Sequence, residues 1–179
     1  MPCSRERGLV IHFRACTRDC PVGLDAVVYC DCFERDRLKA RPMPAWKVQV
    51  NEQGQRVTGA SALPEQLAFD QWDMNACEHE GGILVHHYIG NVARVTALRQ
   101  SLAEHGSYLP VIMSRVVNNA THAGDFLSLE QVERVALELD HLASLALDDP
   151  EKEGRLRHFE SQMRDLATAA LKLKKPIVF

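Results

Sequence analysis

The 179-residue sequence has no apolar run that approaches the ~20 residues of a membrane-spanning helix. The stretch Gly8 to Ala15 is too short for the apolar segment of a secretion signal, and His12 and Arg14 interrupt it. We therefore expect a cytoplasmic protein that does not contact membranes. In that reducing compartment, the six cysteines favour a metal site or free thiols over a disulfide framework.

The sequence also lacks the motifs of several large enzyme classes. It contains no GxxxxGK or GxGxxG for nucleotides, and no GxSxG for a serine nucleophile. His79-Glu80 begins like the HExxH of zinc proteases, but Ile83 stands where the second histidine is required. The HxE and PCxxC pair of zinc deaminases is absent as well. The sequence therefore gives no sign of these enzyme classes.

The charge pattern does not favour nucleic acid as a partner. The formal net charge is −3. Residues 1–47 carry nine Lys/Arg against six Asp/Glu, and the remainder is acidic. Neither part has the concentrated basic stripe of a nucleic-acid binder. The alternating charges of residues 34–41 are typical of a solvated segment; the alternative is an anion-binding rim.

Two short clusters of metal-ligand residues are the most informative feature present. Cys30-Asp31-Cys32 is separated by 44 residues from Cys77-Glu78-His79. Three thiols and one imidazole are the ligand set of a closed tetrahedral zinc site. One histidine among three cysteines favours zinc over copper or an iron–sulfur cluster. The alternative is that Cys30, Cys32 and Cys77 are ordinary buried thiols.

Local patterns predict how these residues meet. A strand from Ala26 to Phe33 would place Cys30 and Cys32 on one face, because side chains two apart on a strand point the same way. A helix from Pro64 to Ala76 would leave Cys77 in the turn that follows. The negative end of a helix disfavours a thiolate, so an ionised Cys77 needs a cation nearby.

The remaining patterns predict an α+β fold: a small, mainly antiparallel sheet with helices on one face and a C-terminal helical pair. Residues 1–24 are expected to be a poorly ordered extension, and residues 25–179 a single metal-binding domain. In the extension, Cys3, His12, Cys16 and Cys20 could bind a second metal. The strands are expected at Trp46 to Val50, Gln55 to Thr58, Ile83 to Ile89 and Leu109 to Val117.

Helices are expected after two capping signals and at the end of the chain. Asn91 is a plausible N-cap, and Ser128 to Gln131 forms a capping box. After a break from Asp148 to Gly154, a last helix carries an apolar seam from Leu156 to Leu173. This seam is expected to pack against the preceding helix; the alternative is dimerisation through it. Leu67, Trp72 and Met74 are expected in the core.

Several motifs together resemble an uncharacterised family of bacterial proteins. These are Tyr29-Cys30-Asp31-Cys32, Phe69-Asp70-Gln71-Trp72, Ala76-Cys77-Glu78-His79 and His87-Tyr88-Ile89-Gly90-Asn91. The similarity covers roughly residues 25–105. It departs at Asp36, where the family tends to have glycine, and at Tyr88, which replaces an often basic residue. The resemblance implies that the motifs belong together and brings no established activity.

Three classes of function remain open from the sequence. The first is a non-enzymatic cytosolic zinc-binding protein that binds or regulates a protein partner, as an immunity protein neutralises a toxin. The second is a metal-dependent hydrolase in which the zinc site is open and His86 or His87 contributes. The third is a homodimeric structural protein whose Leu156–Leu173 seam is exposed on the monomer. Monomer and homodimer are therefore both compatible with the sequence.

Overall fold

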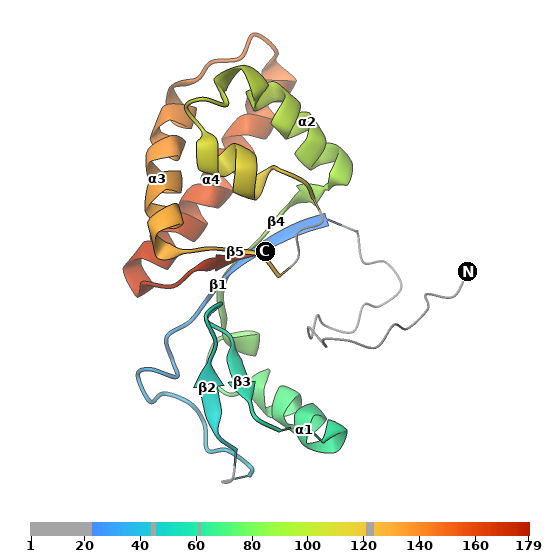
Figure 1. Cartoon of the computed structure of the whole chain (residues 1–179), viewed down its shortest axis with the longest axis vertical. Coiled ribbons are helices and arrows are strands. Elements are labelled where there is room, and N and C mark those ends of the chain that lie inside the picture. Colours follow the sequence, from blue (N-terminus) through green and yellow to red (C-terminus); the bar gives the residue numbers. More distant parts are fainter. Residues whose placement is uncertain (1–22, 44–45, 61, 121–123) are drawn as a thin grey trace, which may run out of the picture.

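The protein has an α+β fold, as expected, with a small antiparallel sheet covered by helices. The computed structural model describes residues 23–43, 46–60, 62–120 and 124–179. Figure 1 shows two parts. Helices α2, α3 and α4 lie together on one side of the four-stranded sheet. A smaller unit, made of hairpin β2–β3 and helix α1, lies past the end of the long strands β1 and β4, away from these helices. We call the first part the body and the second the hairpin lobe.

The sheet of the body has the strand order β4-β1-β6-β5, and all neighbours are antiparallel. Strand β1 (Gly23–Tyr29) pairs along its whole length with β4 (Ile83–Asn91). The short strands β6 (Ile177–Val178) and β5 (Phe126–Leu127), which the sequence did not predict, complete it. Strand β1 begins at Gly23, the first residue that the structure describes. Residues 1–22, which hold Cys3, His12, Cys16 and Cys20, lie outside the described residues.

Three helices bury the apolar face of this sheet. They are α2 (Val92–Leu102), α3 (Leu129–Ser144) and α4 (Pro150–Leu173). Asn91 caps α2, and the capping box of Ser128 and Gln131 opens α3, both as expected. Helix α4 begins at Pro150, before the predicted break ends, because Asp149 caps its first turn through the backbone N–H groups of Glu151 and Lys152. None of the described helices is long and apolar enough to cross a membrane.

The apolar seam of α4 is buried inside the body. Leu156, Phe159, Met163 and Leu166 are at most 2% exposed and belong to the same core as the inward side chains of β1. The seam therefore packs within the chain, as the helical-pair interpretation predicted. It is not the exposed surface that the homodimer hypothesis requires.

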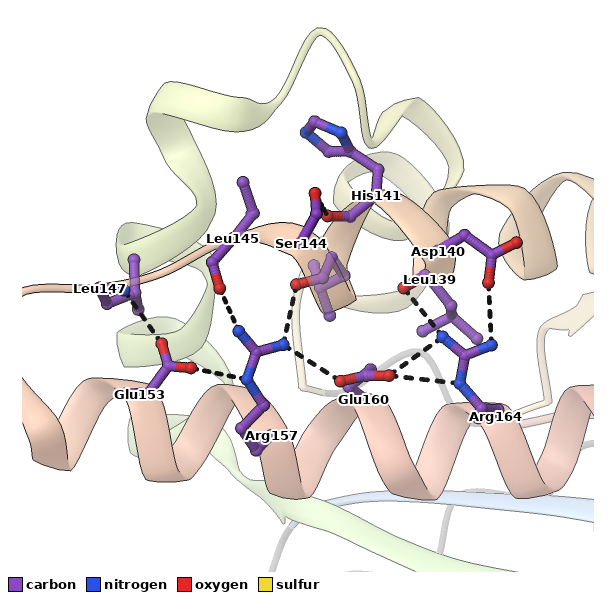
Figure 2. A network of polar contacts seen from close by, with 11 residues as sticks. Leu139, Asp140, His141, Ser144, Leu145, Leu147, Glu153, Arg157, Glu160 and Arg164 are labelled. Carbon is purple, nitrogen blue, oxygen red and sulfur yellow. Dashed lines mark hydrogen bonds and ion pairs between the residues drawn. The ribbon is translucent and has the colours of Figure 1, made fainter.

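Two arginines of α4 fasten it to the end of α3 (Figure 2). Arg157 donates to the carbonyl oxygens of Leu142 and Leu145, and Arg164 donates to that of Leu139. Glu160 lies between the two guanidinium groups and accepts from both. The last carbonyls of α3 thus find donors from the neighbouring helix, which fixes the antiparallel pair.

The expected strand from Leu109 to Val117 is wrong: Ile112–Val116 forms a π-helical turn, η3. Its β-branched residues favour a strand locally, but a buried carboxylate overrides this preference. Glu138 of α3 is 6% exposed and accepts from the backbone N–H groups of Val111 and Ile112, both at 2.8 Å. These N–H groups belong to a helical start, and the carboxylate takes the place of a cap.

The hairpin lobe has a much smaller apolar core than the body. It contains β2 (Val48–Val50), β3 (Arg56–Thr58) and α1 (Leu63–Asp73), and the two strands form the expected antiparallel hairpin. Trp46, Phe69 and Trp72 pack with ring centroids 5.6–6.1 Å apart. Phe69 is the buried residue of α1, whereas Leu67, which was expected in the core, is 55% exposed.

We expect Glu138→Ala to lower the free energy of unfolding by about 2–4 kcal/mol, because two buried N–H groups lose their acceptor. Glu138→Gln should lose less, since its amide oxygen can still accept from one of them. Urea unfolding followed by circular dichroism measures both effects. Glu133→Ala, an exposed position on the same helix, is the control. A loss at Glu138 no larger than at Glu133 would contradict this role for the carboxylate.

Candidate metal centre

The first two cysteines lie in a turn and not on a strand, so the predicted strand from Ala26 to Phe33 is too long. Strand β1 ends at Tyr29, and the chain then coils through residues 30–37, which we call the first ligand loop. The backbone N–H of Arg37 donates to the carbonyl oxygen of Cys32 at 2.8 Å, and Asp36 adopts a left-handed conformation with φ of 53°. This turn, and not strand alternation, brings the two thiols to one side.

The other two candidate ligands, Cys77 and His79, lie after helix α1, as predicted. The second ligand loop, residues 74–82, is closed by hydrogen bonds from Gly81 N–H to the Met74 carbonyl (3.0 Å) and from Gly82 N–H to the His79 carbonyl (2.9 Å). Gly81 and Gly82 have φ of 59° and 72°, values that favour glycine. Two consecutive left-handed residues therefore return the chain from His79 directly into β4.

Hydrogen bonds join the two ligand loops. The N–H of Cys30 donates to the carbonyl of Gly82, and the N–H of Lys39 donates to that of Ala76, both at 2.7 Å. Arg37 also links the residues between the ligands. Its guanidinium lies 3.6 Å from Asp31 and 3.9 Å from Glu78. The loops are thus held in register by the backbone on both sides of the cysteines.

The four predicted ligands converge in space. The Sγ atoms of Cys30, Cys32 and Cys77 and a ring nitrogen of His79 all lie within 4.8 Å of one another. Cys30 and Cys77 have sulfurs 3.8 Å apart, and the Cys32 sulfur lies 3.4 Å from Nδ1 of His79. Around a tetrahedral zinc ion, bond lengths of about 2.3 Å to sulfur and 2.0–2.1 Å to nitrogen give edges of about 3.8 and 3.5 Å. The two distances match these edges, and the Cys₃His group is close enough together to hold a metal ion.

The cysteines are free and deeply buried, which makes their ionisation difficult without a cation. The exposed fractions of Cys30, Cys32 and Cys77 are 6, 1 and 8%. Burial raises the pKa of Cys30, and burial together with the neighbouring cysteines raises the pKa of Cys32 to about 12. Three thiolates would repel one another here. A divalent cation at their centre removes that repulsion.

Cys77 differs from the other two cysteines because Arg56 lies beside it. Burial alone would raise the pKa of the Cys77 thiol, but a hydrogen bond with the His79 backbone and the Arg56 guanidinium bring it below its ordinary value. Nη1 of Arg56 is 3.5 Å from the Cys77 sulfur and 3.8 Å from that of Cys30. The position of Cys77 after a helix predicted a nearby cation, but an arginine on a hairpin strand carries no motif that identifies it in the sequence.

His86 and His87, considered as further ligands, lie outside the Cys₃His group. They stand on opposite faces of β4, and each contacts a carboxylate elsewhere. Nε2 of His86 is 2.8 Å from Asp25, and Nε2 of His87 is 2.7 Å from Asp165 of α4. The three arginines of the segment 34–41 contact groups of the chain itself: Arg35 and Arg37 lie against Asp31, and Arg41 donates to the Trp46 carbonyl. These contacts favour a paired surface over an open anion-binding rim.

Comparison of the chain with protein-family models, curated proteins and solved structures finds no match in any of the three. Any statement about function therefore depends on the geometry of the cluster.

The space beside Gly82 offers a first test of this geometry. A Cβ at Gly82 would lie 2.8–2.9 Å from the guanidinium of Arg56, whereas one at Gly81 would meet only the Met74 sulfur at 3.5 Å. Gly81→Ala should therefore cost about 1 kcal/mol of unfolding free energy, from the left-handed backbone alone. Gly82→Ala should cost about 2–3 kcal/mol more, because it also displaces the buried guanidinium from its partners.

Thermal and urea unfolding of the two variants, with the wild type alongside, measures this difference. Equal losses for Gly81→Ala and Gly82→Ala would mean that Arg56 does not occupy the space against Gly82.

Proposed function

We propose that the protein is a zinc-binding protein in which one Zn²⁺ is held by Cys30, Cys32, Cys77 and His79. The observation that carries the proposal is the convergence of exactly these donor types within 4.8 Å. Four protein donors complete a tetrahedron, and a complete tetrahedron is typical of structural zinc. Zinc is preferred over copper or an iron–sulfur cluster because three thiolates and one imidazole form one of its usual structural ligand sets.

A structural metal in this position would join distant segments of the chain. The first ligand loop follows β1 of the body, and the second follows α1 of the hairpin lobe (Figure 1). The three buried cysteines form a cluster of their own, separate from the apolar core of the body and from the small core around Trp46. Because the metal binds the folded state selectively, its binding energy would stabilise the position of the hairpin lobe next to the body.

We infer from the closed ligand set that the protein acts by binding and not by catalysis. A catalytic zinc keeps a coordination position for water, and the four donors here would leave none. The hydrolase alternative needs His86 or His87 at the metal, and both contact carboxylates elsewhere. The hairpin lobe presents Leu63 and Leu67, 66 and 55% exposed and one turn apart on α1, as apolar surface for a protein partner.

The resemblance to the bacterial family with the C-x-C and A-C-E-H motifs remains part of the proposal. Asp36 supports it, since that residue adopts the left-handed conformation that glycine accepts most readily, and the family tends to have glycine there. Free thiols that face a metal also fit the reducing cytosol, which we propose as the compartment.

We expect the untagged protein, purified without added metal, to contain about one zinc per chain by mass spectrometry. Cys30→Ser, Cys32→Ser and Cys77→Ser should lose this metal and unfold at a lower temperature, since each removes one ligand. His86→Ala, which removes a histidine outside the proposed set, is the control and should keep the metal. Unchanged zinc in Cys32→Ser would reject the ligand set, and a metal-free wild type would reject the site.

The same proteins distinguish a closed site from an open one. Reconstitution with Co²⁺ should give the intense visible absorption of a four-coordinate, thiolate-rich site. The spectrum should not change with small anions such as azide or cyanate, which bind only where a coordination position is free. A change of the spectrum with these anions would favour the hydrolase alternative.

Removal of zinc should loosen the hairpin lobe and leave the body folded. Both tryptophans of the chain, Trp46 and Trp72, pack in the lobe, whereas the long helices α3 and α4 belong to the body. After chelation, we therefore expect the tryptophan emission to shift to longer wavelength while most of the far-UV circular dichroism is kept. Emission that stays unchanged after complete removal of zinc would show that the lobe does not depend on the metal.

A further inference from the structure

Arg56 of β3 is buried between the hairpin and the cysteines, and all its donor groups face the interior. Its side chain is 5% exposed. Nε donates to the Asp73 carboxylate, and Nη2 donates to the Asp73 carbonyl oxygen at 3.1 Å. Nη1 donates to the sulfurs of Cys77 and Cys30, at 3.5 and 3.8 Å. One edge of the guanidinium thus binds the end of α1, and the other edge is directed at the metal ligands.

Sulfur is a suitable partner for this second edge only when it is ionised. A thiol is a weak acceptor, and a buried guanidinium whose donors lack good acceptors is strongly unfavourable. A thiolate is a charged acceptor and makes a stronger hydrogen bond. The position of Nη1 therefore suits sulfurs that lose their protons when they bind a metal.

The charge of the proposed centre also favours a positive side chain beside the sulfurs. Zinc with three thiolates and a neutral imidazole carries a formal charge of −1, in a region where burial makes a net charge costly. Arg56 brings a positive charge against two of the three sulfurs. A buried positive charge next to two thiolates stabilises them. Arg56 therefore favours the metal-bound site over the metal-free site with neutral thiols.

Two features hold Arg56 in this place. Asp73, the last residue of α1, fixes the guanidinium through its carboxylate and its backbone carbonyl. Gly82, with no side chain, leaves the space that the guanidinium fills, since a Cβ there would come within 2.9 Å of it. Neither contact involves a proposed metal ligand. The hairpin, the helix and the second ligand loop therefore position the Arg56 side chain independently of the metal.

On the basis of the zinc site proposed above, we infer that Arg56 is a positioning residue that sets the affinity of the centre for Zn²⁺. It does so by donating to the thiolates of Cys30 and Cys77. It also links occupancy of the site to the hairpin, because the Arg56 side chain joins β3 to the sulfurs of two proposed ligands. Arg56 is thus a contact between the hairpin and the metal site, in addition to the chain that connects α1 to Cys77.

The test is zinc affinity by competition with a chromophoric chelator, for the wild type, Arg56→Gln and Arg56→Lys. Loss of a group that supports metal ligands typically weakens metal binding by about 10–100-fold, and we expect this range for Arg56→Gln. Arg56→Lys keeps the charge and should recover part of the affinity. Arg41→Gln is the control: Arg41 belongs to the same lobe and donates to the Trp46 carbonyl, without contact to sulfur.

A second measurement separates support of the ligands from support of the fold. Hydrogen bonds to thiolates withdraw electron density from sulfur, so the thiolate-to-metal charge-transfer band of the Co²⁺ protein should move to lower energy in Arg56→Gln. A side chain with only a structural role would leave this band in place. If Arg56→Gln does not fold, Asp73→Asn is the second variant. It loosens the guanidinium without removing it and should give a smaller loss of affinity and a smaller shift.

The outcomes distinguish this inference from the proposed function. A wild type without zinc would overturn both. A wild type with one zinc, and an Arg56 or Asp73 variant that keeps both its affinity within about twofold and its Co²⁺ spectrum, would overturn the role of Arg56 alone.

Discussion

Mutual repulsion among three buried sulfurs is the constraint on which the arrangement of this protein depends. Two loops that lie far apart in the sequence bring Cys30, Cys32 and Cys77 together with one imidazole in a volume that excludes water. In such surroundings, the thiols resist ionisation, as the pKa of about 12 for Cys32 indicates. Positive charge relieves this repulsion, and in the described part of the chain the Arg56 guanidinium lies against two of the three sulfurs. The proposed Zn²⁺ supplies the rest.

The two parts of the molecule rely on different forces. The body is held by a large apolar core, to which the sheet, the helix α2 and the α3–α4 pair all contribute. Among its described residues, the hairpin lobe buries Trp46, Val48 and Phe69 as a core of its own. This is too little apolar surface to stabilise so short a hairpin and helix independently. Polar and sulfur contacts near the ligand loops therefore have a larger share in holding the lobe than in holding the body.

The sequence was sufficient where a pattern is local and strong. The caps at Asn91 and Ser128, the hairpin and the apolar seam of α4 were predicted from spacing alone, and so were the four residues of the cluster. It failed where distant groups decide the structure. Residues 109–117 have the composition of a strand, but Glu138 from another helix stabilises a helical turn there. Arg56 has no signal in the sequence, since its role arises only when β3, α1 and Gly82 meet.

The pairing of Val27 with Val178 in the central part of the sheet has a kinetic consequence. Strands β1 and β6 come from opposite ends of the described chain, so their contact closes a loop that includes nearly all of the domain. Contacts of such high sequence separation form slowly, whereas the α3–α4 pair is local and can form early. The helical pair is thus expected to precede the sheet during folding, with the edge of β1 left open to other strands until β6 arrives.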